Sequence, residues 1–119
     1  MTIKSYKDLI VWQKAMNLVE GVYELTAKFP KSEQYELSKQ MRGCATSIPS
    51  NIAEGSRRST KKDYRHFMCI AFGSGAELET QIEISKRLSY ASSKDFLKVD
   101  GLLDEVMRML NTMIGNLNE

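Results

Sequence analysis

The chain has 119 residues, of which 42% are hydrophobic and 27% charged, and its formal net charge is +2. This size and composition are typical of one globular domain (1–119) with a real core, and no apolar run is long enough to cross a bilayer. The N-terminal stretch lacks the apolar region of a signal peptide, so we expect a cytoplasmic protein in which Cys44 and Cys69 are reduced core residues.

Two apolar stripes predict a long helix from Asp8 to Lys28. One stripe consists of Leu9, Trp12, Met16, Val19, Tyr23 and Thr26, and the other of Val11, Ala15, Leu18, Val22, Leu25 and Phe29. Together they cover an arc of about 200°, whereas a helix that faces one core usually shows an arc of about 100° or a little more. The excess favours a second packing partner such as another subunit, and the alternative is a helix set deeply in its own bundle. The sequence does not tell which stripe faces outward, and we place the candidate oligomer interface at Val11, Leu18, Val22 and Leu25.

A second helix is predicted after Pro30, which disfavours helical angles at the preceding residue. Ser32 is the expected N-cap, and the helix should run to about Glu54, with Gly55 as the residue after its end. Pro49 lies inside this helix. It removes one backbone hydrogen bond and predicts a kink about one turn earlier, with a break at the proline as the alternative.

Capping signals predict two further helices. Either Thr60 or Ser59 should cap the third helix, and Thr60 with Asp63 has the spacing of a capping box, as does Ser92 with Asp95. Small residues in the third helix (AFGSGA, 71–76) lower its helix propensity, which predicts close approach of a neighbouring backbone. The last helix carries an unbroken apolar stripe: Phe96, Val99, Leu103, Val106, Leu110, Met113 and Leu117. Four helices with short turns predict an all-α, antiparallel up-down-up-down four-helix bundle.

No set of side chains in the sequence predicts an active site. His66 is the only histidine, and a di-metal site in a bundle needs two Glu-x-x-His motifs with two further glutamates. Serine–histidine catalysis would need His66 buried beside a serine, but it stands in a basic turn that should be exposed. Helical-bundle RNases of the HEPN class need an arginine four to six residues before the histidine, and this spacing is missing. We therefore predict a protein that is not an enzyme and that holds no metal and no cofactor.

Positive charge gathers at the turn between the second and third helices. Against Asp63 alone, positions 57 to 65 carry five basic residues: Arg57, Arg58, Lys61, Lys62 and Arg65. Such clusters bind phosphates through counterion release and do not read base sequence. Tyr64 beside them could stack on an unpaired base. The alternative is a solvated turn, because charges are common at the ends of bundles.

Four stretches carry a family resemblance: YKDLIVWQKAMNL (6–18), KFP (28–30), SIPSNIAEG (47–55) and GSGAELETQ (73–81). In this order they resemble the four-helix-bundle proteins encoded in intervening sequences of bacterial 23S rRNA genes, a family labelled S23 ribosomal protein. That family includes the accessory variability protein of diversity-generating retroelements, which forms a five-fold barrel of bundles and contacts nucleic acid and a reverse transcriptase. The resemblance implies a homopentamer that binds RNA or DNA. It implies neither an enzyme nor a ribosome component.

The leading prediction is therefore a non-enzymatic, oligomeric bundle that binds RNA or DNA non-specifically through its basic turn. The alternative is a protein-interaction scaffold without nucleic-acid binding. In the stretch IPSNIAEG, Asn51 and Glu54 are expected either to cap a helix or to bond across an interface.

Overall fold

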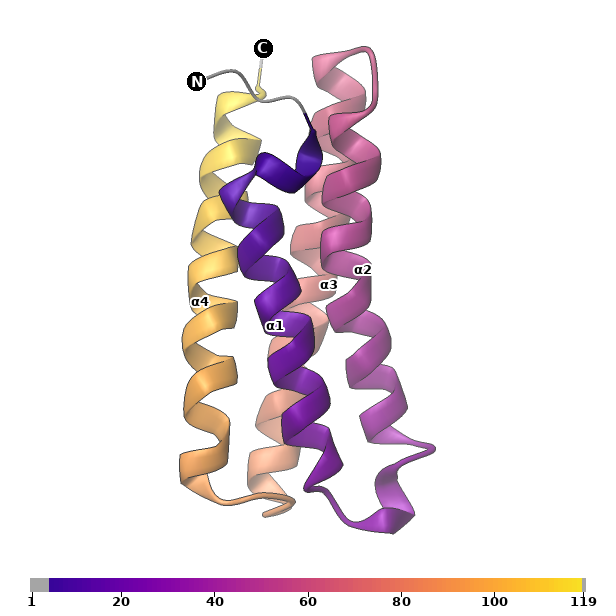
Figure 1. Cartoon of the computed structure of the whole chain (residues 1–119), viewed down its shortest axis with the longest axis vertical. Helices are drawn as coiled ribbons and strands as arrows, with labels where there is room; N and C mark the ends of the chain where they lie inside the picture. The colour runs from indigo at the N-terminus through magenta and orange to yellow at the C-terminus, as the bar shows by residue number, and fades with distance from the viewer. Residues whose placement is uncertain (1–4, 119) are drawn as a thin grey trace.

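In the computed structural model, residues 5–118 are described, and they form four α-helices and two short 3-10 helices without any β-strand. In chain order these are η1 (Tyr6–Asp8), α1 (Ile10–Ala27), η2 (Lys31–Glu33), α2 (Leu37–Ser56), α3 (Lys61–Arg87) and α4 (Ser93–Asn116). Figure 1 shows the four α-helices side by side and alternating in direction, with the start of α1 and the end of α4 at the same end. The predicted all-α four-helix bundle is confirmed.

Each α-helix packs against two others. Both α1 and α3 contact α2 and α4, so the pairs α1–α3 and α2–α4 lie across the diagonals of the bundle. The Cα trace extends 44 × 24 × 21 Å, and one core of buried apolar side chains runs between the helices. None of the helices in the described part of the chain is long and apolar enough to span a membrane.

The two apolar stripes of α1 have different surroundings. The inner stripe is buried, with at most 2% of each side chain exposed at Val11, Leu18, Val22 and Leu25. Their assignment to an oligomer interface is therefore wrong, because these side chains fill the chain's own core and cannot reach a second subunit. In the outer stripe, Trp12 is partly buried, whereas Met16 and Tyr23 are 38% and 46% exposed. The wide apolar arc thus combines a core stripe with an outer one that the bundle leaves partly uncovered.

The start of α2 differs from the prediction. Ser32 lies in η2 and does not cap α2, which begins five residues later at Leu37. The connection stays attached to the end of α1 instead, since Gln34 Nε2 donates hydrogen bonds to the carbonyl oxygens of Thr26 (3.0 Å) and Phe29 (3.4 Å). These bonds hold the loop between α1 and α2 against the end of α1, so α2 begins only at Leu37.

Pro49 is accommodated inside a continuous helix. It is buried in α2, so the predicted single helix is confirmed here, the alternative of a break is wrong, and the kink stays a prediction. Polar side chains next to the proline bond to carbonyl oxygens one turn earlier. Ser50 Oγ donates to Thr46 O (2.9 Å) and Asn51 Nδ2 donates to Ser47 O (2.8 Å).

Gly55 has a packing role. It lies within α2 and has no left-handed φ, so its prediction as the residue after the helix end is wrong. A Cβ atom at this position would lie 2.8 Å from Phe67 Cβ and 3.2 Å from Tyr64 Cδ1, both on α3. The absence of a side chain lets α2 and α3 approach closely just before the basic turn.

The predicted caps of α3 and α4 are observed. Thr60 Oγ1 accepts a hydrogen bond from the Asp63 amide at 3.1 Å, and Ser92 with Asp95 forms a complete capping box. The small residues of α3 act differently from the prediction. At Gly75, a Cβ would collide with the Met107 side chain of α4 and not with a backbone, and the space beside Gly73 is open.

Candidate nucleic-acid interface

The turn that joins α2 to α3, residues 57–60, lies at the end of the bundle where α1 starts and α4 finishes (Figure 1). We call this region the basic end and define it by the five predicted residues: Arg57, Arg58, Lys61, Lys62 and Arg65. Four of the five are exposed, and Arg65 is half-buried. The five side chains have different surroundings, so they differ in how far their positive charge is available to a ligand.

Arg57 and Arg58 follow the last residue of α2, and each lies over an aromatic ring. The guanidinium carbon of Arg57 is 5.4 Å from the centre of the Tyr6 ring, and that of Arg58 is 4.7 Å from the centre of the Phe67 ring. Arg58 also pairs with Glu54 at 3.6 Å. Cations suit the C-terminal end of a helix, so part of the positive charge here contributes to stability.

Arg65 is turned toward the end of α4. Its Nε donates a hydrogen bond to the carbonyl oxygen of Ile114 at 3.3 Å. Carbonyls in the last turn of a helix have no partner within the helix, so this bond satisfies one of them. Arg65 therefore fastens α4 to α3 and is less available to a ligand than its neighbours.

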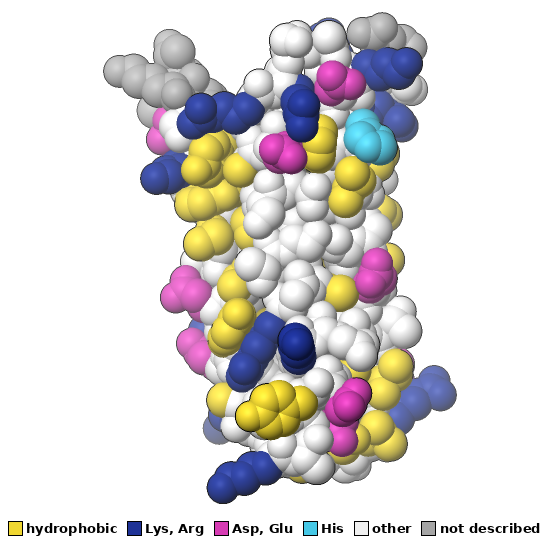
Figure 2. All heavy atoms as spheres, turned by 90° about the vertical axis from the view of Figure 1, so that its right-hand side faces the viewer, with side chains coloured by type: hydrophobic (Ala, Val, Ile, Leu, Met, Phe, Trp, Pro, Cys, Tyr) yellow, Lys and Arg dark blue, Asp and Glu magenta, His cyan; other side chains and the backbone are white. Residues whose placement is uncertain are grey.

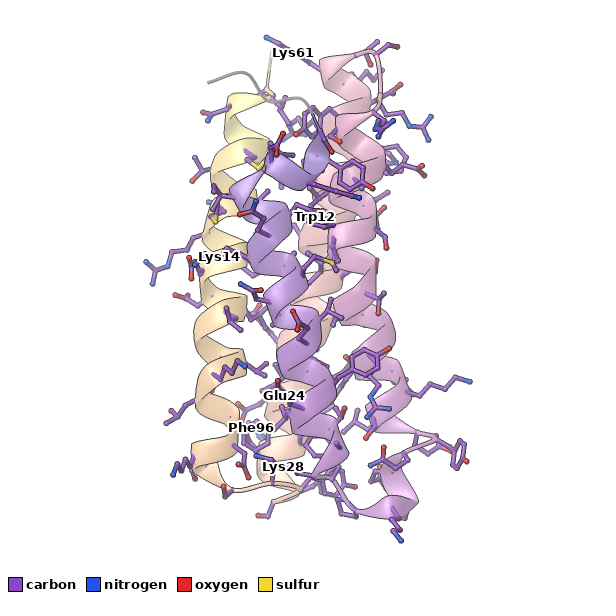
Figure 3. The ribbon with its side chains drawn as sticks, viewed as in Figure 1. Trp12, Lys14, Glu24, Lys28, Lys61 and Phe96 are labelled. Atoms are coloured by element: carbon purple, nitrogen blue, oxygen red, sulfur yellow. The ribbon has the colours of Figure 1, made fainter. Side chains whose placement is uncertain are left out.

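Lys61 and Lys62 have no such structural role. They are the first two residues of α3, where the helix dipole disfavours positive charge. Among the described residues, neither has a carboxylate within ion-pair distance. Figure 3 shows Lys61 at the extremity of the basic end, directed away from the helices. These two ammonium groups are open to an external anion.

The aromatic residues between the cations are less free than predicted. Tyr64 is half-buried against the Gly55 backbone, and this burial raises the pKa of its phenol. Part of its ring is therefore covered by α2. His66 is exposed, and its ring meets the ring of Phe67 edge to face at 5.6 Å. Beside the cations the exposed ring is therefore that of His66, whereas Tyr64 is half-buried.

Asn51 and Glu54 bond within the chain. Asn51 Nδ2 donates to Ser47 O and lies 3.0 Å from Ser47 Oγ, which in turn hydrogen-bonds Ser74 Oγ of α3 at 2.8 Å. Glu54 pairs with Arg58. The capping alternative is therefore wrong for both residues, and a bond across an interface stays a prediction; the observed bonds stabilise α2 and its contact with α3.

The described residues form no cluster that could hold a metal ion, and Cys44 is not an activated nucleophile. Residues 5–118 contain no group of three or more His, Cys, Asp or Glu side chains that could hold a metal ion. Burial raises the pKa of the Cys44 thiol, a hydrogen bond with Gln81 opposes this, and the charge of Glu77 adds to it. The thiol therefore stays protonated at neutral pH and is a poor nucleophile. Cys69 is exposed, so its expected place in the core is wrong.

One neighbour of the basic end was not predicted from sequence. The ring of Tyr6 in η1 lies beneath Arg57, 51 positions away in the chain. No local pattern predicts this contact, because only the packing of η1 against α2 brings the two residues together.

Comparison with known proteins agrees with this architecture. The family model of the 23S rRNA-intervening sequence protein matches residues 7–112. A crystal structure of a protein of unknown function from the S23 ribosomal protein family of Bacteroides thetaiotaomicron has the same fold. It superposes with a TM-score of 0.82 at 21% sequence identity, covering 89% of this chain and 96% of the other. No functionally curated protein matches the sequence. The extent of the family match shows that the chain belongs to the 23S rRNA-intervening sequence protein family.

Proposed function

We propose that this protein is a non-enzymatic, cytoplasmic helical bundle that binds RNA or DNA through phosphate contacts at its basic end. The observation that carries the proposal is the position of Lys61 and Lys62. Both are exposed, neither has a carboxylate partner among the described residues, and both stand where the helix dipole disfavours them. Lys94 stands at the same position of α4, so what sets Lys61 and Lys62 apart is that Arg57 and Arg58 lie beside them in one cationic cluster.

The surroundings favour binding that does not depend on base sequence. Arg57 and Arg58 are exposed beside the two lysines and extend the cationic surface across the turn. Tyr64 is half-buried, so this ring is not freely available to select unpaired bases. Affinity should then come from released counterions and should fall steeply as salt increases.

Self-association is the second part of the proposal. The outer stripe of α1 leaves Met16 38% exposed, and on the opposite flank of the core stripe Ile10 is 55% exposed. Ile10 also borders an apolar groove between the start of α1 and the end of α4, lined by Leu9, Met109 and Met113. A second copy would cover these side chains, and the resemblance to a five-fold barrel of bundles supports a pentamer. Repeated basic ends would then gain affinity through avidity.

The test is a fluorescence-anisotropy titration with a single-stranded RNA and a duplex DNA at several salt concentrations. Reversing Arg57, Arg58, Lys61 and Lys62 to glutamate should abolish binding without loss of helicity. A control variant reverses four cations away from the basic end, Arg87, Lys94, Lys98 and Arg108, and makes the same change in net charge. Retained affinity in the first variant, or an equal loss in both, would sink the proposal.

A protein-interaction scaffold is the second candidate, and the partly uncovered outer stripe of α1 favours it. A partner such as a polymerase would cover that stripe instead of another copy. Binding to a protein that survives both nuclease and high salt would favour this candidate. Loss of that binding in Met16→Glu would locate it on α1.

A further inference from the structure

Arg42 of α2 is held in one orientation by residues of α1. Its Nε donates a hydrogen bond to Thr26 Oγ1 at 2.9 Å, and its guanidinium carbon lies 4.7 Å from the centre of the Tyr23 ring. Thr26 is fully buried, and its hydroxyl donates to the carbonyl oxygen of Val22 at 2.8 Å. The hydroxyl is therefore fixed too, and the half-buried guanidinium is positioned from two sides.

The outer edge of this guanidinium has no partner in the described chain. Three other arginines, Arg58, Arg87 and Arg108, each pair with a carboxylate four residues earlier in the chain. Arg42 makes no ion pair, although it is less exposed than these three. With Nε occupied, the two Nη groups remain as parallel donors, which match two oxygens of a phosphate or carboxylate.

The segment that precedes Arg42 in the chain adds an aromatic ring and a second cation. Tyr35, two residues before α2, is 87% exposed. Lys39 is also exposed and lies three residues before Arg42, on the same side of the helix. Gln34 bonds the carbonyl oxygen of Thr26 at 3.0 Å, so the residue that positions Arg42 also anchors the loop that carries Tyr35. Figure 2 shows Lys and Arg side chains toward both ends of this face, with hydrophobic side chains beside the lower group and a largely uncharged middle.

We infer that Arg42, Lys39 and Tyr35 form a binding site for single-stranded nucleic acid, separate from the basic end. A backbone phosphate binds the Nη edge of Arg42 and the ammonium of Lys39, and an unpaired base stacks on Tyr35. An acidic peptide would supply oxygens for Arg42 but no flat ring for Tyr35, so the exposed tyrosine favours the nucleic acid. Duplex does not fit this site, because its bases are already stacked.

The site rests on the proposed function and deepens it by selecting the form of nucleic acid. Arg42 and Arg58 are 16 positions apart in the α2 region, which corresponds to about 24 Å along a helix. A single strand long enough to cover this distance can bind both sites of one chain. Its affinity should then exceed that of a duplex, which binds the basic end alone.

The test compares a labelled 20-nucleotide oligouridylate with a 20-base-pair duplex in anisotropy titrations at fixed low salt. Tyr35→Ala and Arg42→Gln should each weaken binding of the single strand roughly five-fold or more and leave the duplex unchanged. Arg42→Lys keeps the positive charge but loses the paired N–H donors of the guanidinium. It should therefore weaken single-strand binding as Arg42→Gln does. The matched control is Arg87→Gln, which removes one exposed arginine on α3 and should have little effect. Tyr35→Ala removes a side chain that supports no packing, so misfolding cannot explain its result.

A second readout locates the contact directly. Photo-crosslinking with 4-thiouridine and peptide mapping should identify Tyr35. Unchanged single-strand affinity in Tyr35→Ala and Arg42→Gln, with binding lost only when the basic end is reversed, would overturn this inference and leave the proposed function standing. Selective loss in these two variants, with no effect of reversing the basic end, would support this site and reject the basic end. Competition by a polyglutamate peptide that depends equally on Tyr35 and Arg42 would overturn the inference in favour of an acidic protein partner.

Discussion

Lys62 and Lys94 occupy equivalent positions in two helices. Comparing substitutions at the two positions therefore distinguishes the effect of such a lysine on fold stability from its effect on nucleic-acid binding. Each is the second residue of its helix and stands between a capping hydroxyl residue and an aspartate. Each is exposed and has no carboxylate partner among the residues described. Only Lys62 belongs to the basic end. We predict that Lys62→Gln and Lys94→Gln both stabilise the fold and that only Lys62→Gln weakens nucleic-acid binding.

The gain in stability follows from the helix dipole. A cation in the first turn is unfavourable by about 0.3–1 kcal/mol at low ionic strength, and glutamine has nearly the same helix propensity as lysine. An unfolding entropy of about 2.1 cal/mol/K per residue gives about 0.25 kcal/mol/K for a chain of this length. Each substitution should therefore raise Tm by about 1–4 °C, measured by circular dichroism at low salt.

The loss in binding follows from counterion release. One phosphate contact to a single strand contributes a slope of about 0.7 in log K against log salt, which at 0.1 M salt is roughly a five-fold loss of affinity. Anisotropy titrations across a salt series measure both the affinity and the slope. Equal weakening by Lys62→Gln and Lys94→Gln would show that binding follows net charge, and would falsify a local site. A lower Tm in either variant would contradict the dipole argument.

Further predictions concern packing, pH and association. Gly55→Ala places a methyl group 2.8 Å from an α3 side-chain carbon and should lower the free energy of unfolding in urea by about 1–3 kcal/mol. Gly43→Ala in the same helix, with no atom within 4 Å, should raise it by up to about 1 kcal/mol. Hydrogen bonds from Lys28 and the cap lower the pKa of Asp95 from 3.8 to about 2, so stability should fall as pH drops from about 4 towards 2, and Asp95→Asn should lack this part of the pH profile. Met16→Glu should abolish self-association in sedimentation velocity while the fold remains, whereas the same change in the core stripe of α1 should unfold the chain.

Local signals in the sequence predicted the beginnings of α3 and α4. Thr60, Ser92 and Asp95 act through bonds to backbone groups within three residues, so their effect depends on near neighbours alone. Ser32 carries the same kind of signal and was predicted wrongly. Gln34 bonds back to the end of α1 and keeps the intervening segment out of the helix. A cap predicted from sequence therefore fails where a tertiary contact competes for the same residues.

Features that depend on the distance between helices could not be predicted. Gly55 follows a glutamate near the end of an apolar pattern, which is typical of a helix terminus, yet its role is the close approach of Phe67. The two stripes of α1 are similarly apolar, so composition alone could not tell core residues such as Leu18 from the partly exposed Met16. For the candidate site, sequence predicted the cluster of cations. It could not predict that Arg65 would donate a hydrogen bond to the carbonyl oxygen of Ile114 while Lys61 remains exposed to solvent.

The connections of the bundle also have a kinetic consequence. Only four residues separate α2 from α3, and these helices are held together by the contact at Gly55 and the bond between Ser47 and Ser74. The contact between α1 and α4 instead joins opposite ends of the chain, and closing so long a loop costs more conformational entropy. The α2–α3 hairpin should therefore form in the folding transition state and α1 should dock on α4 afterwards, so that changes in the hairpin slow folding and changes between α1 and α4 speed unfolding.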